Sequence, residues 1–412
     1  FPRYTGYCEQ MDSHMPTLTV KEALFVSASL RLDASDEIRK NNVNKVIKQL
    51  LLTNYQDQMI GTPGLNGVSP EIRKLVTIGV ELVCSPAVLF LDEPTTGLDS
   101  SSALATMHLC QQIAKSDGIA ILCTIHQPAT EIFDLFDVLL LLQKGGRVSY
   151  FGNTSAMVEY FEEQCGAPPL AQGENPADFS LTCASMAAFR VQNQKFATSA
   201  DVFEQYQERE QESKQQIRSE QHPDAALYKS PFATSSLQQF LVLFRVYTYL
   251  HWRDTKVLYT RMTLAIVFGL MVGILFYDVG SDQMGAKARI SVIFISIVYA
   301  GNVANMAIPT MVMTRPIVYR ERSSNAYRLC PFYWAVLMAE LPFVIVQGLL
   351  YALTMYYLVG FQSGLKFVLF STGFVLLSML TFAFSHLMAS ISANADVGTI
   401  LSATCQSVFT LF

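Results

Sequence analysis

The sequence has 412 residues, of which 51% are hydrophobic and 15% are charged, and its formal net charge is −5 at pH 7. This length accommodates two or three domains, and this hydrophobicity excludes a wholly soluble protein, so a membrane part is expected. The small negative charge and the absence of a long basic run give no indication of nucleic-acid binding. The eight cysteines are scattered without a Cys-x-x-Cys pair, which argues against a disulfide framework or a structural metal site.

Three helices are predicted in the first part of the chain. Thr19 stands three residues before Glu22, which is the spacing of a capping box, and this predicts a helix that continues to about Leu32. Apolar residues at helical spacing predict a second helix between about 35 and 52. Ser69, followed by proline, predicts the start of a third helix.

The stretch Val88–Ser100 has the pattern of a nucleotide site. Its four leading apolar residues predict a buried parallel strand that ends on two adjacent carboxylates, Asp92 and Glu93. Asp92 can hold Mg²⁺ through water at the carboxyl end of the strand, and Glu93 can polarise a water for attack on a γ-phosphate. The alternative is a buried strand followed by an acidic turn without function, because so short a motif also recurs by chance.

A second buried strand is predicted from Ile119 to Thr124, and it delivers His126 to the same edge of the sheet as Glu93. A hairpin is predicted from strands at 138–142 and 148–151 around a glycine-containing turn. Residues from about 187 to 222 are rich in glutamine and glutamate, which predicts a solvated linker helix.

The last part of the chain has the pattern of a membrane domain. Residues 238–258 mix aromatic, aliphatic and basic side chains, which is typical of an amphipathic helix at a membrane interface. Apolar spans are predicted at about 262–278, 290–313, 331–360 and 366–391, with a fifth begun at about 397. Basic residues flank the segments assigned to the cytosolic side, so the topology is expected to start inside. Because an even number of spans should close such a domain, the chain is expected to be cut at its end.

These motifs occur in the order of a known family. Val88–Ser100 resembles the Walker B strand and D-loop of ATP-binding-cassette (ABC) ATPases, the segment 124–128 around His126 resembles their switch histidine, and Gln10 resembles their Q-loop glutamine. Segments 319–322 and 339–342 resemble the G subfamily, and segment 77–82 resembles the second half of its full-length pleiotropic-drug-resistance members.

The resemblance implies an α/β nucleotide-binding domain, with a RecA-like core and a helical subdomain, followed by an all-α polytopic transmembrane domain. It divides the chain into a nucleotide-binding domain at 1–190, a linker at 191–235 and a transmembrane domain at 236–412. No Gly-x-x-x-x-Gly-Lys-[Ser/Thr] phosphate loop occurs in the sequence. The chain is therefore expected to be truncated at its front and, taken alone, not to bind ATP properly.

The family pattern also assigns roles within the nucleotide site, whose cofactors would be ATP and Mg²⁺. Glu93 would be the catalytic base and His126 the γ-phosphate sensor, Asp92 and Gln10 would be the Mg²⁺ partners, and Asp99 would belong to the nucleotide-binding residues.

The signature of the family, usually Leu-Ser-Gly-Gly-Gln, is degenerate here because only Ser69 remains of it. Pro70 has no N–H to offer a γ-phosphate, and Glu71 places a negative charge beside it, so the chemical role of this segment is in doubt. In the family each ATP lies between the phosphate loop of one domain and the signature of the other. The resemblance therefore implies that Ser69 faces the partner domain's phosphates.

Polar residues in the membrane part have two interpretations. Asn302 and Asn305 lie one helical turn apart, and a polar stripe follows in the last span, formed by Thr399, Ser402 and Gln406. Such groups can form hydrogen bonds between helices. The resemblance favours the other interpretation, a substrate path, because the second and fifth helices of the G subfamily line the translocation cavity.

Charged residues of the membrane part are predicted to connect it with ATP hydrolysis. Glu340 is costly to bury without a partner, so it is either a structural counter-ion or a coupling residue, and the coupling role is favoured. A loop with Tyr319, Arg320, Glu321 and Arg322 is predicted to reach the nucleotide domain and to carry the coupling.

We therefore predict half of a pleiotropic-drug-resistance ABC exporter that moves amphipathic or hydrophobic small molecules across a membrane. Its partners would be the missing N-terminal half, the small-molecule substrate and the lipid bilayer, and it would lie in the plasma membrane with its nucleotide domain in the cytosol. A degenerate regulatory membrane subunit is an alternative, which the damaged signature favours and the retained Glu93 and His126 oppose. A non-transporting ABC ATPase is a further alternative, which the membrane spans oppose.

Overall fold

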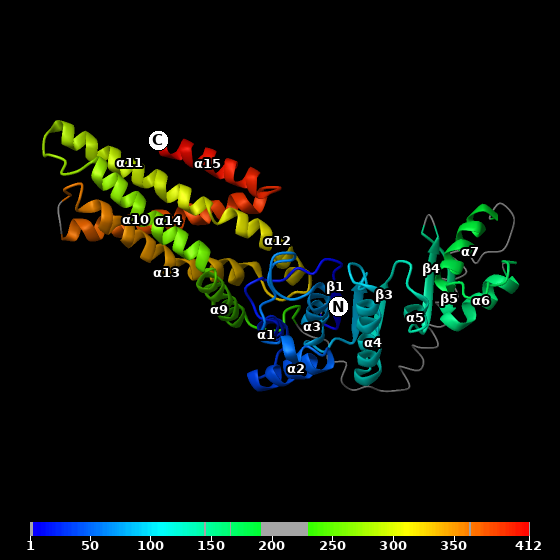
Figure 1. Cartoon of the computed structure of the whole chain (residues 1–412). Helices are drawn as coiled ribbons and strands as arrows, with labels where there is room; N and C mark the ends of the chain where they lie inside the picture. Colours follow the sequence, from blue (N-terminus) through cyan, green and yellow to red (C-terminus); the bar gives the residue numbers. More distant parts are fainter. Residues whose placement is uncertain (1–2, 144–145, 165, 191–229, 362–363, 412) are drawn as a thin grey trace.

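The computed structural model describes residues 3–143, 146–164, 166–190, 230–361 and 364–411. An α/β part formed by the first half of the chain joins a bundle of long helices formed by the second half (Figure 1). This arrangement confirms the predicted order of an α/β domain followed by a helical membrane domain.

A parallel sheet with the strand order β1-β2-β3 carries the predicted nucleotide motifs. Its strands are β1 (Thr5–Cys8), β2 (Val88–Asp92) and β3 (Ala120–Thr124). Asp92, the last residue of β2, is paired with Thr124, the last residue of β3. The prediction of a parallel strand that ends on Asp92 is therefore confirmed, and the carboxyl ends of β2 and β3 lie at one edge.

The prediction that the strand ending at Thr124 is buried is wrong. Residues along β3 alternate between exposed and half-buried, and the side chain of Leu122 is 58% exposed. The reason is that β3 is the edge strand of this sheet in the described part of the chain and has a neighbour on one side only.

Helices α1 (Val20–Arg31), α2 (Asp36–Gln49) and α3 (Pro70–Leu82) pack against the sheet and one another. The predicted capping box is present, since Thr19 Oγ1 accepts from the Glu22 N–H and the Glu22 carboxylate accepts from the Thr19 N–H. Thr53–Tyr55 form a short 3₁₀ helix, η1. The core beneath these helices includes Leu24, Leu50, Ile78, Leu89 and Leu91.

Helix α4 (Ser100–Asp117) follows β2, and a second lobe follows β3. This lobe contains the predicted hairpin, which is the antiparallel pair β4 (Val138–Gln143) and β5 (Arg147–Asn153), and it lies apart from the parallel sheet in Figure 1. The remaining elements of the lobe are α5 (Thr130–Phe133), η2 (Thr154–Ala156), α6 (Met157–Glu159), the π-helix η3 (Tyr160–Gln164) and α7 (Pro176–Arg190). Most of the predicted linker helix, and most of the linker at 191–235, fall outside the described residues.

Four helical segments in the described part of the chain are long and apolar enough to span a membrane. They are α10 (Thr255–Leu275), the nearly continuous pair α11 (Gln283–Asn305) and α12 (Ile308–Ser323), α13 (Leu329–Tyr356) and α14 (Leu365–Ile391). These segments confirm four of the predicted spans with shifted boundaries. At the predicted fifth span lies α15 (Ala395–Leu411), whose 17 residues are fewer than the roughly 20 that a bilayer needs.

Helix α9 (Ser236–Arg253) precedes the first span and is shorter than the helix predicted at 238–258. The helix ends because Asp254 breaks it and caps α10, where its carboxylate accepts from the Val257 N–H at 3.2 Å. One apolar cluster connects α9 with both halves of the molecule. It includes Met15, Leu18 and Leu30 from the α/β part and Leu243, Val246, Ile317, Tyr327 and Ala339 from the helical part.

Candidate nucleotide site and its connection to the membrane helices

Thr124 joins the ends of β2 and β3 at the predicted site. Its hydroxyl donates to Asp92 Oδ1 at 2.7 Å and accepts from the backbone N–H of Glu93 at 3.0 Å. Tyr7 adds a second hydroxyl, which donates to Asp92 Oδ2 at 3.2 Å. The two hydroxyl groups fix Asp92 at the carboxyl edge of the sheet.

Gln10 lies against Glu93. The Gln10 Nε2 donates to Glu93 Oε2 at 2.7 Å, and the Thr96 hydroxyl donates to the same oxygen at 2.9 Å. The structure therefore brings together three predicted site residues that are up to 83 positions apart in the sequence, Gln10, Asp92 and Glu93.

Backbone strain marks the two segments that follow the strands. Glu93 has φ 46° and Gln127 has φ 44°, which is the left-handed region that costs a non-glycine residue about 1 kcal/mol or more. Glu93 directly follows β2, and Gln127 follows the exposed His126 beyond β3. His126 is therefore on the segment that leaves the same edge of the sheet as Glu93.

Two other predicted site residues act as helix caps. The carboxylate of Asp99 accepts from the Ser102 N–H at 2.7 Å at the start of α4, and this hydrogen bond lowers the pKa of Asp99. Ser69 Oγ accepts from the Ile72 N–H at 3.4 Å, with Pro70 at the first position of α3. Both residues thus have a structural role that does not depend on a nucleotide.

The donors at this edge fit Mg²⁺, which is commonly held by one or two carboxylates together with water and phosphate oxygens. Asp92 and Gln10 would supply protein oxygens, and Glu93 lies beside them. No group of three or more His, Cys, Asp or Glu residues that could hold a metal occurs among the described residues. No sequence motif for a phosphate-cradling loop occurs among the 412 residues, so at a nucleotide site these residues would serve only the Mg²⁺ and the water.

The segment that carries Gln10 is held from two sides. Lys74 Nζ on α3 donates to the Gln10 carbonyl at 2.9 Å and pairs with Asp12 at 3.1 Å. Arg320 at the end of α12 donates from Nη1 to the Ser13 carbonyl at 2.5 Å. Helix α12 of the membrane part therefore contacts Ser13, which lies three residues after Gln10.

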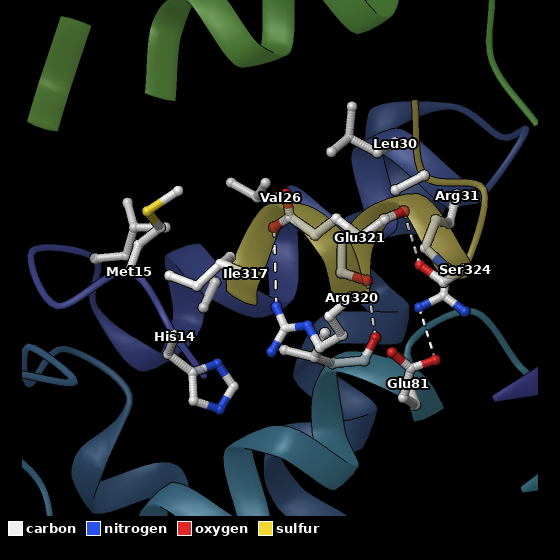
Figure 2. Close-up of a pocket in the computed structure, with 15 residues that line it drawn as sticks. His14, Met15, Val26, Leu30, Arg31, Glu81, Ile317, Arg320, Glu321 and Ser324 are labelled. Atoms are coloured by element: carbon white, nitrogen blue, oxygen red, sulfur yellow. Dashed lines mark hydrogen bonds and ion pairs between the residues drawn. The ribbon is translucent and has the colours of Figure 1, made fainter. Parts of the chain in front are cut away.

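Figure 2 shows the residues that line a small cavity of about 30 Å³, to which Arg320 also belongs. Glu81 on α3 and Arg31 on α1 form a buried ion pair of 2.8 Å at its side. From α12, Arg320 lies 3.8 Å from the carboxylate of Glu321, which also accepts from the Tyr327 hydroxyl at 2.7 Å. The cavity is thus lined by charged groups of both parts.

The segment Tyr319–Arg322 is not the loop that was predicted, because it forms the last turns of α12. The helix continues through it after α11, and the turn toward α13 begins only beyond Ser323. Within the segment, Arg320 is buried, whereas Arg322 is exposed and Tyr319 is 58% exposed. The helical periodicity therefore directs only part of the segment toward the nucleotide domain.

Glu340 is fully buried within α13 and has two cationic partners. The Glu340 oxygens lie 2.5 Å from His251 Nε2 on α9 and 2.6 Å from Arg261 Nη2 on α10. Arg261 also donates from Nε to Gln347 at 3.1 Å. Glu340 therefore has the structural counter-ion role, which was one of the two predicted alternatives. Its coupling role stays a prediction.

Asn305 is the centre of a buried polar network between α11, α14 and α15. Its Oδ1 accepts from Ser402 at 2.7 Å, from Ser385 at 2.9 Å and from Gln406 at 3.4 Å. Hydrogen bonding between helices therefore accounts for Asn305, Ser402 and Gln406.

Asn302 and Thr399 lie outside this network. The exposed Asn302 faces a cavity of about 460 Å³ between the same helices, and Gln406 also lines it. The Thr399 hydroxyl donates to the Ala395 carbonyl of its own helix at 2.9 Å.

Comparison with known proteins identifies the segments described above. The family model "ABC transporter" matches residues 1–96, and two models described as "ABC-2 type transporter" match residues 126–182 and 238–412. ABC transporter G family member 38 of Oryza sativa subsp. japonica is 33% identical over the whole chain, and ABC transporter G family member 31 of Arabidopsis thaliana is 32% identical. The chain spans 28% and 30% of the length of these two relatives.

Among solved structures, CbiO1 of Clostridium perfringens, described as part of the ABC transporter complex CbiONQ, is 24% identical. The match has a TM-score of 0.34 and covers 39% of this chain and 61% of that chain. Together, the matching family models, the parallel sheet with its motifs and the membrane-spanning helices identify an integral membrane protein. The chain is a homologue of the ABC transporters of the G family and combines an ABC nucleotide-binding region with an ABC-2 type membrane region.

Proposed function

We propose that this chain is part of an ATP-driven exporter of amphipathic or hydrophobic small molecules, of the pleiotropic-drug-resistance type. The observation that carries the proposal is the convergence of Gln10, Asp92 and Glu93 at one edge of the sheet. Three residues after Gln10, the chain accepts a hydrogen bond from helix α12 of the membrane part. A site for phosphate hydrolysis next to a contact with membrane helices is the arrangement that a pump requires.

In the proposed mechanism, each residue at the edge has one task. Mg·ATP, when bound, supplies the bond to be broken and neutralises charge on the phosphates. Asp92, which the hydroxyls of Thr124 and Tyr7 orient, and Gln10 would hold the metal. Glu93 would accept a proton from the attacking water, and His126 would contact the γ-phosphate.

Arg320 would transmit the state of the site to the membrane helices. It contacts the Ser13 carbonyl, and Gln10 on the same segment contacts Glu93, so a shift of Gln10 on nucleotide binding would change the contact of α12. Glu321 would set the position of Arg320, since its carboxylate faces that guanidinium and is fixed by Tyr327. Tyr319 and Arg322, which are exposed, would have a smaller part in this coupling.

The substrate path would include the cavity beside Asn302 and Gln406. Its lining is otherwise mostly apolar, with residues such as Leu377, Leu380 and Phe384, which suits a hydrophobic molecule with a few polar groups. The polar stripe with Thr399 and Ser402 on α15 would border it, while Glu340 would hold α9, α10 and α13 together at the entrance.

The remaining parts of the machine would come from outside this chain. The partner would be an N-terminal half with its own nucleotide-binding and membrane domains, and the boundaries proposed within this chain are 1–190, 191–235 and 236–412. The nucleotide domain would lie in the cytosol and the helices in the plasma membrane, because the basic residues flank the segments on the nucleotide domain's side.

A degenerate regulatory subunit is the second candidate, and the start of α3 is the observation that favours it. Pro70 occupies the first helical position and Glu71 the second, where an intact signature would offer N–H groups to a phosphate. Hydrolysis by the full-length protein distinguishes the two candidates.

The test is Glu93→Gln in the full-length protein that contains this chain. An amide cannot accept the proton of the attacking water, so we expect ATP hydrolysis to fall about a hundredfold or more and efflux of a fluorescent amphiphile to stop. Glu37→Gln on the exposed side of α2 is the matched control and should leave both rates unchanged. Normal hydrolysis and efflux in the Glu93→Gln variant would remove Glu93 from the role of base.

A further inference from the structure

A groove of about 620 Å³ lies between helices α1 and α2 of the nucleotide-binding region and helix α9, apart from the nucleotide site. Apolar side chains from all three helices line it, among them Phe25, Val26, Val43, Leu241 and Val242. Phe25, Val26 and Val242 are half-buried, whereas Leu241 is 54% exposed. The groove therefore offers an apolar surface that is large enough for part of a small amphiphile.

The charges of the groove do not cancel. Both of its acidic residues are already paired: Glu22 accepts two hydrogen bonds from Arg253, at 2.6 and 2.8 Å, and Asp36 pairs with Arg39 at 2.7 Å. Three exposed cationic side chains remain, which are Lys21, Lys40 and Arg245. None of the three has an acidic partner within 4.0 Å among the described residues.

One end of the groove lies close to the membrane. Asp254 is the only residue between α9 and the first membrane span, and the Glu22–Arg253 pair lies at this end. The ring of Tyr249 lies 5.5 Å from the guanidinium of Arg245 and 5.7 Å from that of Arg253. Aromatic and basic side chains together are typical of the interface between a bilayer and water.

We propose that this groove binds an anionic phospholipid from the leaflet that borders α9. The phosphate would lie between Lys21 and Arg245, and the beginning of one acyl chain would cover the apolar floor. Arg245 stands eight residues before Arg253, about 12 Å along the helix, which a lipid headgroup with part of its chain can span. A zwitterionic lipid brings a cation of its own and would leave the net positive charge of the groove uncompensated, and a free phosphate would leave the apolar floor uncovered.

The test measures lipid binding to the detergent-solubilised full-length protein by native mass spectrometry, with dioctanoyl phosphatidic acid as the probe. We expect it to bind about tenfold or more tightly than dioctanoyl phosphatidylcholine, and to bind more weakly at high salt. The double variant Lys21→Glu/Arg245→Glu should lose this preference. Lys48→Glu, which reverses one charge at an exposed position of α2 outside the groove, should keep it.

Three results would overturn the proposal. They are equal binding of the two lipids to the wild-type protein, an unchanged preference in the double variant, and displacement of phosphatidic acid by an equal concentration of glycerol 3-phosphate, which would identify a free-anion site. Thermal melting of each variant verifies folding. If the double variant melts early, Lys21→Gln/Arg245→Gln replaces it, with the same loss expected.

Discussion

Glu93 is held by neighbours from three different segments. Gln10 and Thr96 donate to its side chain, and Thr124 accepts from its backbone N–H. Its left-handed backbone is tolerated because these contacts over-determine it. In its proposed role as base, a carboxylate pre-positioned in this way would lose little orientational freedom when a water molecule arrives.

The pairing of His251 predicts a pH dependence of stability. Burial alone lowers the pKa of His251, but the hydrogen bond to Glu340 and the charge of that carboxylate outweigh burial and raise the pKa above its ordinary value of 6.5. Arg261 on α10 opposes the rise, and the Tyr247 carbonyl on α9 supports it through the other ring nitrogen. A pKa that folding raises contributes stability that is complete below the unfolded value and is lost as the pH rises through the folded value.

We therefore expect the melting temperature of the full-length protein to fall as the pH rises from about 6 through the raised pKa of His251. In His251→Gln this component of the pH dependence should disappear. His108→Gln, at an exposed position on α4, is the control and should keep it. A pH dependence that is identical in wild type and His251→Gln would show that the pair with Glu340 does not carry a charge.

At the scale of residues, the sequence predicted the charged members of the site but not the groups that orient them. Asp92 and Glu93 stand at the end of an apolar run, and their chemistry is unusual enough to be noticed. Thr124 and Tyr7 act through hydrogen bonds that depend on the register of three strands, which the sequence does not reveal. The partners of Glu340 were also missed, because they lie on two other helices and their contact depends on how the helices pack.

At the scale of elements, the contact of α1 with α3 depends on the ion pair between Arg31 and Glu81. Both side chains are almost fully buried, 8% and 3% exposed. Removing one partner leaves the other charge buried without compensation, which costs about 3 kcal/mol or more. We expect Glu81→Ala to lower the melting temperature of the full-length protein strongly.

The double variant Arg31→Ala/Glu81→Ala is the companion measurement. It removes both charges, so it should melt closer to the wild type than Glu81→Ala does. If the losses in melting temperature caused by Arg31→Ala and by Glu81→Ala simply added in the double variant, the two residues would not act as a pair. A charged residue within the apolar run of α3 is a signal that the sequence contained, although its partner on α1 could not be read from it.

Two arginines near the end of helix α12 are expected to differ in their effect on coupling. Arg320 is buried against the Ser13 carbonyl, whereas Arg322 is exposed on the other side of the helix. Arg320→Glu should therefore uncouple the two activities, so that ATP hydrolysis continues while efflux falls about tenfold or more. Arg322→Glu is the matched comparison and should change the ratio of efflux to hydrolysis much less. Equal effects of both changes, in step with the amount of folded protein, would make the end of α12 merely structural.

The sequence predicted the existence of most elements better than their limits. The caps predicted at Thr19 and Ser69, and the helical spacing of apolar residues from about 35, were sufficient to locate the beginnings of α1, α3 and α2. The end of α9 depends on one aspartate, and the length of α12 depends on packing against the nucleotide-binding region. Apolar composition alone could not show that α12 continues as a helix through its charged end.

At the scale of the whole molecule, the two regions form a continuous contact. The apolar cluster around Leu30, Tyr247 and Ile317 surrounds the charged cavity at Arg320, so the regions meet through packing as well as through hydrogen bonds. In the proposed transporter this contact would move as a unit when Gln10 changes its position. The site at the β2 edge would then drive the cycle, while the start of α3 would face the phosphates of the partner domain.

The most direct test of this account compares Glu93→Gln with Ser69→Asp in the full-length protein. Aspartate caps a helix as well as serine does, so Ser69→Asp should preserve α3 while it adds a charge to the degenerate signature. We expect ATP hydrolysis and efflux to persist in Ser69→Asp and to cease in Glu93→Gln, because in the proposed transporter only the site with Glu93 is competent. The opposite ranking, with Ser69→Asp folded but inactive and Glu93→Gln active, would contradict it.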